Sequence, residues 1–336
     1  MPRGSFAIPF ANFLPKRLMR QCAGRSRQQQ ETSIRGKTVV ITGATSGIGK
    51  VAAQRLAQMG ARLVLVARDP VRGEAALARL PACGPGLTHS IHYADLSDLA
   101  AMKRVGAEIA AAEPRIDVLV NNAGGLFASR QVTRDGLERT FAVNHLAYFV
   151  LTHLLRDRLI AAAPARVVNT ASDAHVREKL DFDDLQFAHG YRFRAAYGRS
   201  KLANILFTRE LARRLAGTGV TANCLHPGFI ATGLGQSDNR WLGFMVRLAM
   251  ALRAEPAEKG AEIIVYLASS PEVAGVTGEY FCDCRPISPS ADAQSDDDAR
   301  RLWLESERLA GLSQKCQKQT WKATPTIRSP EQGHST

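Results

Sequence analysis

A glycine-rich turn between an apolar strand and a helix is the feature that most constrains this chain. Residues 38–42 read TVVIT, and the turn GATSGIGK follows at residues 43–50. Ala52, Leu56 and Met59 come next, at the spacing of one helix face. A helix that starts directly after a strand points its first amide groups and its positive dipole end at the turn, where a phosphate can bind. A plain strand-to-helix turn is the alternative, but the pattern favours an α/β unit that binds a dinucleotide.

Short apolar runs alternate with longer helical stretches from about residue 36 to residue 312. Runs such as Val39-Val40-Ile41 and Leu63-Val64-Leu65-Val66 are apolar throughout, which is typical of parallel strands that are buried on both faces. This pattern predicts one doubly wound α/β domain with a seven-stranded, mostly parallel sheet and helices on both faces. The expected strands are Thr38–Thr42, Arg62–Ala67, Ser90–Ala94, Val118–Asn121, Arg166–Thr170, Val220–Leu225 and Gly278–Cys282.

The net charge of +13 lies mostly in the two ends of the chain. Residues 1–35 carry +6 and residues 314–336 carry +3, so the centre is close to ordinary at +4. We expect residues 1–35 to be a disordered basic extension or a leader, and residues 313–336 to be a loose polar tail. A cytoplasmic location is expected, with the mitochondrion as the alternative if the basic segment is a transit peptide. A nucleic-acid-binding protein was considered and is not favoured, because the chain lacks an aromatic-basic platform and a recognition-helix motif.

Neither a transmembrane anchor nor a metal site is expected. No run of 18 or more apolar residues is present, so a transmembrane anchor is not predicted. The six cysteines include one C-x-C pair, Cys282 and Cys284, which lacks a second zinc knuckle. We therefore expect no metal site and reduced thiols.

Several motifs in order give the chain a family resemblance. The turn has the spacing G-x3-G-x-G, which differs from G-x-G-x-x-G and resembles that of short-chain dehydrogenases/reductases. The segments Arg166–Asn169, Lys201–Leu215 and Gly278–Leu312 are similar to those of retinol-dehydrogenase-type members and their bacterial relatives. The resemblance implies a Rossmann-type fold over residues 36–312 and an oxidoreductase that interconverts an alcohol and a carbonyl. The other matching motifs are Asn121-Asn122-Ala123-Gly124, Asn144, Ser172, Tyr197-Gly198-Arg199-Ser200-Lys201 and His226-Pro227-Gly228.

The resemblance also implies a set of cofactor-binding positions. Asp95 corresponds to the residue that contacts the adenine, although a helix N-cap is an equal alternative. Thr232 corresponds to a residue at the nicotinamide carboxamide, with a turn hydroxyl as its alternative. The full set is Gly43, Thr45, Ser46, Gly47, Ile48, Gly49, Arg68, Asp95, Asn121, Ala123, Gly124, Tyr197, Lys201, Pro227, Gly228 and Thr232.

The end of the second strand indicates which dinucleotide binds. An NAD enzyme usually has Asp or Glu there to accept from the ribose hydroxyl. Here Ala67 is followed by Arg68, and a guanidinium can bind a 2′-phosphate with two hydrogen bonds. Lys50 and Thr45 are near enough in sequence to assist. We therefore expect NADP(H), with NAD(H) less favoured and a solvated loop arginine as the alternative for Arg68.

Four residues are candidates for the chemistry. Tyr197 and Lys201 are four apart, so on a helix they share one face. A free tyrosine has a pKa near ~10, and a cation close by is expected to lower it so that the tyrosine can exchange a proton with the substrate oxygen. Ser172 follows a strand and can hydrogen-bond the reacting oxygen. The resemblance makes Asn144 the fourth member, which shapes a helix and supports a water chain to the lysine.

Two segments bear on the substrate. The stretch between Ser172 and Tyr197 holds aromatic and apolar residues that would either line an apolar cleft or pack a long loop. Residues 241–252 read WLGFMVRLAMAL and are expected to form a substrate-covering helix, or a surface helix that touches lipid or a partner. Together they favour a bulky apolar substrate such as a retinoid, steroid or long-chain carbonyl. The residues of the first stretch are Phe182, Leu185, Phe187, Tyr191 and Phe193.

The resemblance also implies a homo-oligomer, dimer or tetramer, formed through the long helices Glu138–Leu159 and Ala196–Leu215. A protein that senses NADP(H) without turnover is the alternative function. The complete set Ser172, Tyr197 and Lys201 argues against that alternative.

Overall fold

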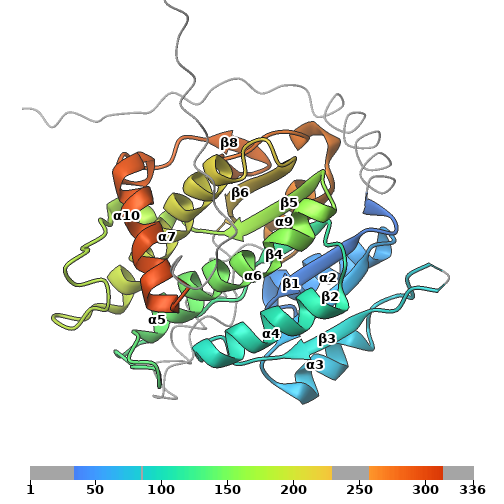
Figure 1. The fold of residues 1–336 in the computed structure, drawn as a ribbon, viewed down its shortest axis with the longest axis horizontal. Helices are drawn as coiled ribbons and strands as arrows, with labels where there is room; N and C mark the ends of the chain where they lie inside the picture. The colour runs from blue at the N-terminus through green and yellow to red at the C-terminus, as the bar shows by residue number, and fades with distance from the viewer. Residues whose placement is uncertain (1–33, 85, 229–256, 313–336) are drawn as a thin grey trace, which may run out of the picture.

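An eight-stranded sheet forms the centre of the protein in the computed structural model, which describes residues 34–84, 86–228 and 257–312 (Figure 1). The strand order is β3-β2-β1-β4-β5-β6-β7-β8. Every neighbouring pair is parallel except β7 and β8, which are antiparallel. The strands are β1 (Thr38–Thr42), β2 (Arg62–Ala67), β3 (Ser90–Tyr93), β4 (Val118–Asn121), β5 (Ala165–Thr170), β6 (Val220–His226), β7 (Tyr280–Cys282) and β8 (Arg285–Ile287).

The predicted fold class is confirmed, and all seven expected strands are present with their ends moved by no more than two residues. The additional strand β8 was missed. It has three exposed residues, includes Pro286, and pairs only with β7 at the sheet edge. A short exposed edge strand buries no apolar face, so its sequence carries no strand pattern.

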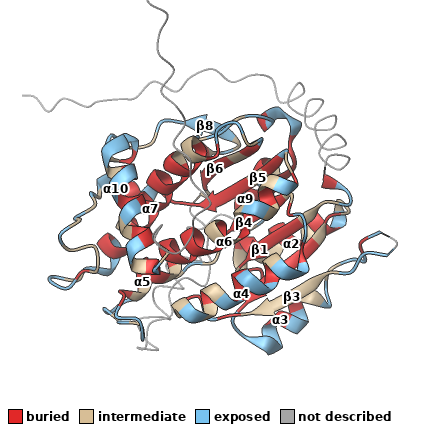
Figure 2. Ribbon diagram, viewed as in Figure 1, coloured by how far each residue is buried: buried red, intermediate tan, exposed pale blue. Residues whose placement is uncertain are grey.

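Helices cover both faces of the sheet because successive strand residues point to opposite sides. Val40 and Val64 face the core beneath α4, α6, α7 and α10, whereas Val39 and Leu63 face the core beneath α2 and α9. Figure 2 shows the buried strands between these two layers. The helices are α2 (Gly47–Gln58), α3 (Pro70–Leu77), α4 (Leu99–Ala112), α5 (Arg139–Phe141), α6 (Ala147–Ala161), α7 (Phe193–Arg214), α9 (Ala257–Ser269) and α10 (Asp296–Ala310), with short 3-10 segments at Asp173–Arg177, Pro271–Val273 and Asp292–Gln294.

The helix expected over residues 138–159 is interrupted near its start. One turn of α5 is followed by a π-helical turn, Ala142–Leu146, and then by α6. A π turn adds one residue per turn and so rotates the side chains that follow it, and such turns are frequent at functional sites. Asn144 lies inside this turn.

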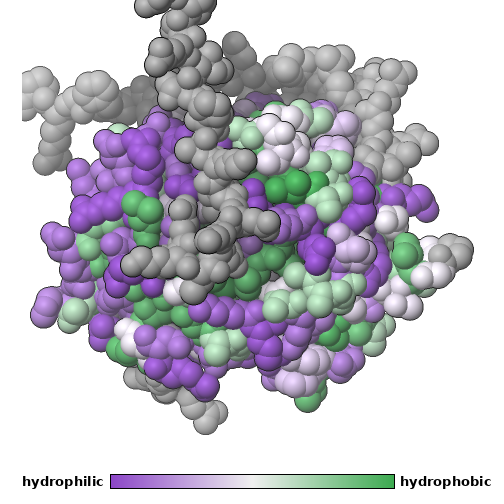
Figure 3. Space-filling model, viewed as in Figure 1, coloured by the Kyte–Doolittle hydropathy of each residue, from purple (hydrophilic) through white to green (hydrophobic). Residues whose placement is uncertain are grey.

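Helix α10 packs against α6 and α7. The Trp303 ring stacks on Phe207 with centroids 5.8 Å apart and meets Phe149 edge-on at 4.9 Å. Its outer side is charged, and Figure 3 shows hydrophilic residues over this part of the surface. The chain's own α10 therefore covers part of the helix pair that was expected to form an oligomer interface.

The switch point of the sheet lies between β1 and β4. The chain continues from β1 to β2 and β3 on one side of β1, and β4 and the later strands lie on its other side. Loops diverge at such a switch point and leave a crevice at the carboxyl ends of the strands. The Thr42 hydroxyl accepts hydrogen bonds from the backbone N–H groups of Asn122 and Ala123, both at 2.9 Å, and so joins the two diverging loops. Among the described residues, no helix is both long and apolar enough to cross a bilayer.

Candidate active site

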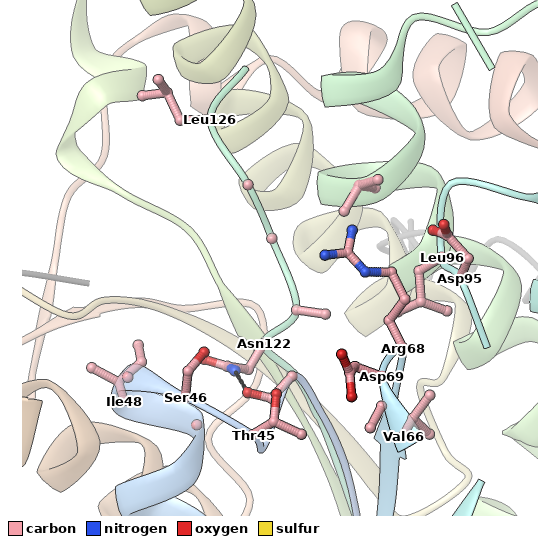
Figure 4. A pocket seen from close by; sticks show the side chains of 18 of the residues that line it. Thr45, Ser46, Ile48, Val66, Arg68, Asp69, Asp95, Leu96, Asn122 and Leu126 are labelled. Carbon is pink, nitrogen blue, oxygen red and sulfur yellow. Dashed lines mark hydrogen bonds between the residues drawn. The ribbon is translucent and has the colours of Figure 1, made fainter. Parts of the chain in front are cut away.

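A pocket of about 300 Å³ opens at this switch point (Figure 4). It is formed by the residues that follow β1, β2, β3, β4, β5 and β6, together with residues of α7. The structure brings most of the sequence-predicted site residues together here. Those on its wall are Gly43, Thr45, Ser46, Gly47, Ile48, Gly49, Arg68, Asp95, Ala123, Gly124, Ser172, Tyr197, Lys201, Pro227 and Gly228.

The glycine turn has no room for side chains at two positions. Gly43 has a φ of +72°, and a Cβ there would lie 2.8 Å from the Cα of Ala123. A Cβ on Gly49 would lie 2.5 Å from the carbonyl oxygen of Gly43. Ser46 is the N-cap of α2, and its side chain makes no capping hydrogen bond. The first-turn amides therefore face the pocket as donors, which fits the pyrophosphate of a dinucleotide.

Two arginines line the pocket at the carboxyl end of β2. The exposed Arg68 was expected there, and Figure 4 shows its guanidinium directed into the pocket. Arg72 was not expected, because it lies inside α3, where arginine is an ordinary surface residue. The carboxylate of Asp69 lies between them in sequence and caps α3 by accepting the N–H of Arg72 at 3.0 Å. Lys50, expected to assist, is not on the pocket wall.

Asp95 lines the pocket and is not the helix cap that was its alternative. Its Oδ1 accepts from the N–H of Ser97 at 2.9 Å and from the Ser97 hydroxyl at 2.8 Å. The cap of α4 is Asp98, whose carboxylate accepts from the first amides of that helix. The buried Leu96 forms the adjacent apolar wall.

Tyr197 and Lys201 rise from one face of α7 into the pocket. The Nζ of Lys201 lies 5.5 Å from the Tyr197 ring centroid and donates to the carbonyl oxygen of Thr170 at 3.1 Å. Lys201 is only 3% exposed. The long helix fixes both side chains, as the spacing predicted.

The expected electrostatic relation between these two groups is wrong for the protein as the structure describes it. Burial raises the pKa of Tyr197 to about 12, with the negative charge of Asp173 adding to the rise and a hydrogen bond with Ser172 opposing it. Burial lowers the pKa of Lys201 to about 7. Since both groups are desolvated, burial favours the neutral form of each, and the pKa of Tyr197 is raised and not lowered.

Ser172 lines the pocket with this pair, whereas Asn144 does not. Ser172, and not the adjacent Ala171, is on the pocket wall, where it caps the 3-10 turn that follows β5. Asn144 is fully buried behind the wall. Its side chain binds both backbone groups of Gly125 at 2.7 and 2.9 Å and donates to the Ser200 hydroxyl at 3.0 Å. Asn144 thus holds the loop after β4 against α7.

One predicted cofactor residue is placed differently. Asn121 is buried and does not line the pocket, because its Nδ2 donates to Asn169 at 2.9 Å and to Thr152 at 3.0 Å. As the last residue of β4 it points into the sheet layer, and its neighbours Asn122 and Ala123 reach the pocket instead. Thr232 lies outside the described residues, as does the apolar segment 241–252.

The aromatic stretch between Ser172 and Tyr197 was expected either to line a cleft or to pack a long loop. The structure favours packing. None of its five expected residues lines the pocket. Phe187 and Tyr191 form a small separate core with Ala195 and Ala196. Part of the pocket wall is instead formed by residues with no recognisable motif, which follow β4 or lie at the start of the next helix. They are Gly125, Leu126, Phe127, Arg139 and Val143.

Beside Asn144, the buried His145 couples stability to pH. Its ring is fully buried and lies 2.8 Å (Nε2) from the Ser306 hydroxyl, and burial lowers its pKa to about 4. The unfolded chain binds the extra proton between about pH 6.5 and pH 4, so we expect the free energy of unfolding to fall by about 3 kcal/mol as the pH is lowered through that window.

The measurement is urea unfolding of the wild type and of His145→Gln at pH 7 and at pH 4. The variant should be less stable at pH 7, and its deficit should shrink at pH 4 because it carries no imidazole. An equal pH dependence in both proteins would show that another group is responsible.

The fold and this pocket define the class of the protein. Residues 37–243 match the family profile described as short chain dehydrogenase. The chain belongs to the short-chain dehydrogenase/reductase family, whose members are oxidoreductases that act on CH–OH donors with a bound nicotinamide dinucleotide.

Within that family the chain is of the retinol-dehydrogenase type. It is 42% identical over 289 residues to retinol dehydrogenase 13 of Homo sapiens, covering 84% of this chain and 87% of that protein. The structure of the Pseudomonas aeruginosa RhlG/NADP active-site complex is 28% identical with a TM-score of 0.60, covering 75% of this chain and 96% of that one. The structure of a short chain dehydrogenase from Burkholderia cenocepacia in complex with NADP is 27% identical with a TM-score of 0.59. The match covers 78% of this chain and 100% of that one. The resemblance inferred from the motifs is confirmed.

Proposed function

We propose that this chain is an NADP(H)-dependent oxidoreductase that interconverts an alcohol and an aldehyde or ketone on a bulky apolar substrate. The observation that carries the proposal is the convergence of Ser172, Tyr197 and Lys201 with the glycine turn on one pocket. The name of the relative retinol dehydrogenase 13 supports a retinoid or a similar apolar alcohol. A survey of alcohols with NADP⁺ and carbonyls with NADPH, followed by the nicotinamide absorbance, tests it. Binding of NADPH without turnover of any of them would favour the sensing alternative.

The residues present fit the cofactor. The amides of Ser46, Gly47 and Ile48 would hold the pyrophosphate, and Leu96, beside Asp95, would cover the adenine side of the pocket. The bound nicotinamide supplies the hydride acceptor or donor, and the protein supplies the proton.

The proton chemistry follows from the pKa shifts. Because its pKa is raised to about 12, Tyr197 is protonated at neutral pH and can donate its proton to a substrate oxygen that gains charge during reduction. The Ser172 hydroxyl lines the same wall and can stabilise that oxygen by a hydrogen bond. Lys201 has a pKa of about 7, so near neutral pH it can supply a proton to replace the one that Tyr197 has donated. In the oxidation direction the same groups act in reverse.

The preference for NADP(H) gives a second prediction. Arg68 and Arg72 both line the β2 end of the pocket and can bind the 2′-phosphate. We expect Arg68→Ala to lower kcat/KM for NADPH by about 10- to 100-fold, the loss of one charge-assisted contact, and to leave the value for NADH nearly unchanged. Lys50→Ala is the matched control, since Lys50 is off the pocket wall. A wild-type preference for NADH, or equal losses with both cofactors, would contradict the assignment.

The assembly and the location are also proposals. We expect a homo-oligomer, which sedimentation would measure, formed by surfaces other than those that α10 covers. We expect a cytoplasmic protein, with mitochondrial import as the alternative, and cell fractionation separates the two.

A further inference from the structure

Arg139 is a rigidly held cation on the pocket wall. Its guanidinium carbon lies 4.4 Å from the centroid of the Phe127 ring, in a cation–π arrangement. The backbone N–H of Arg139 donates to the carbonyl oxygen of Gln131 at 2.9 Å, and its Nη1 donates to the Gln131 side chain. A side chain held by two contacts on a backbone that is itself hydrogen-bonded is preorganised to bind a ligand group.

The charge of Arg139 has no carboxylate partner among the residues that the structure describes. The adjacent Glu138 is buried, and its carboxylate is used elsewhere. It accepts from the N–H and the hydroxyl of Thr140, each at 2.7 Å, and from the N–H of Phe141 at 2.8 Å. The Nε of Arg139 is buried and makes no hydrogen bond within the described chain. A buried donor without an acceptor is costly, and at the wall of a binding pocket the natural acceptor is the ligand.

A continuous wall connects Arg139 to the reacting groups. A Cβ on Gly124 would lie 3.6 Å from the Nζ of Lys201, and a Cβ on Gly125 would lie 2.9 Å from the Phe127 ring. Arg139 contacts that same ring. Gly124 and Gly125 therefore connect the lysine to the Phe127 ring, and the guanidinium lies over that ring.

This position is separate from the arginines at the end of β2. Arg68 and Arg72 follow β2, whereas Arg139 begins the helix after β4. The pocket thus carries arginines from two segments that are far apart in the sequence. One pair suits a phosphate of the dinucleotide, and the other cation is left for a different anion.

We propose that Arg139 binds an anionic group of the substrate, so that the preferred substrate is an oxo or hydroxy compound with an apolar body and a carboxylate remote from the reacting oxygen. This inference rests on the proposed function, because it names the substrate of that same site. Leu126, Phe127 and Val143 would contact the apolar body, and the planar guanidinium would bind the carboxylate through two hydrogen bonds. An uncharged alcohol would offer the guanidinium no carboxylate.

The test compares two substrates that differ only in charge: a medium-chain ω-oxo fatty acid and its methyl ester, each reduced with NADPH. We expect the wild type to prefer the acid in kcat/KM by about 10- to 100-fold, the range for a hydrogen-bonded charge. Arg139→Met should bring the acid-to-ester ratio of kcat/KM close to one, and Arg139→Lys should retain part of the preference. Arg130→Met is the matched control, because Arg130 is exposed, donates to the carbonyl oxygen of Gln186 and is not on the pocket wall.

Each other outcome has a distinct meaning. A wild type that reduces both compounds without preferring the acid overturns the role of Arg139 and leaves the proposed function standing. A loss of NADPH affinity in Arg139→Met, with the acid-to-ester ratio unchanged, assigns the arginine to the cofactor and also overturns the proposal. Failure of the wild type to reduce any carbonyl compound overturns the proposed function itself. The acid-to-ester ratio of the wild type is measured without any variant. The proposal can therefore be overturned even if Arg139→Met folds poorly.

Discussion

Replacing Tyr197 by Phe is expected to lower kcat by about 10³-fold, within the range lost when a general acid is removed, while NADPH binds as before. The variant keeps the ring that packs beside Lys201 and removes only the hydroxyl that carries the proton. Single-turnover reduction of a confirmed substrate measures the chemical step, and quenching of protein fluorescence by NADPH measures binding.

Tyr266→Phe is the control for this change. Tyr266 lies on α9, where its hydroxyl donates to Glu272 at 3.1 Å, and it is not on the pocket wall. We expect nearly normal kcat from that protein. If Tyr197→Phe also retained nearly normal kcat, the proton would have to come from another group, and the proposed mechanism would be abandoned.

Adding one methyl group at Gly49 is expected to weaken NADPH binding by about 100-fold or more, which corresponds to about 2.7 kcal/mol. A Cβ there would lie 2.5 Å from the carbonyl oxygen of Gly43 and 2.3 Å from the Nδ2 of Asn122. Since the first contact is with backbone, the turn that cradles the phosphates must move. Isothermal calorimetry with NADPH measures the loss, and thermal unfolding of the same samples shows whether the variant is folded.

Gly84→Ala is the matched substitution, because a Cβ at Gly84 meets no atom within 4 Å and its φ is not in the left-handed region. It should bind NADPH like the wild type. A Kd for Gly49→Ala within threefold of the wild-type value would show that the turn tolerates the methyl group, and the close packing would then not define the site.

Much of the site could be predicted because its residues are fixed by local geometry. The glycine turn, Ser172 and Pro227 each follow a strand, and the carboxyl ends of parallel strands meet at one sheet edge. Tyr197 and Lys201 share a helix face because they are four residues apart. None of these placements needs knowledge of which distant segment packs nearby.

The features that could not be predicted depend instead on contacts between distant segments. Asn121 was expected at the cofactor but does not line the pocket. The direction of its side chain depends on hydrogen bonds to Asn169 and Thr152 in other elements. The aromatic stretch gave equal support to a cleft and to packing, because both bury apolar surface. The π turn around Asn144 leaves no pattern, since the helical periodicity continues on both sides of it.

The sequence by itself determined the family, the doubly wound sheet and the placement of Tyr197 and Lys201 on one helix face, because these follow from strand patterns and short spacings. Only the tertiary structure decided the pKa values of Tyr197 and Lys201, which depend on how completely the surrounding elements exclude water. It also decided that Arg139 faces the pocket without a carboxylate among the described residues, because charge pairing depends on side chains brought together from distant parts of the chain.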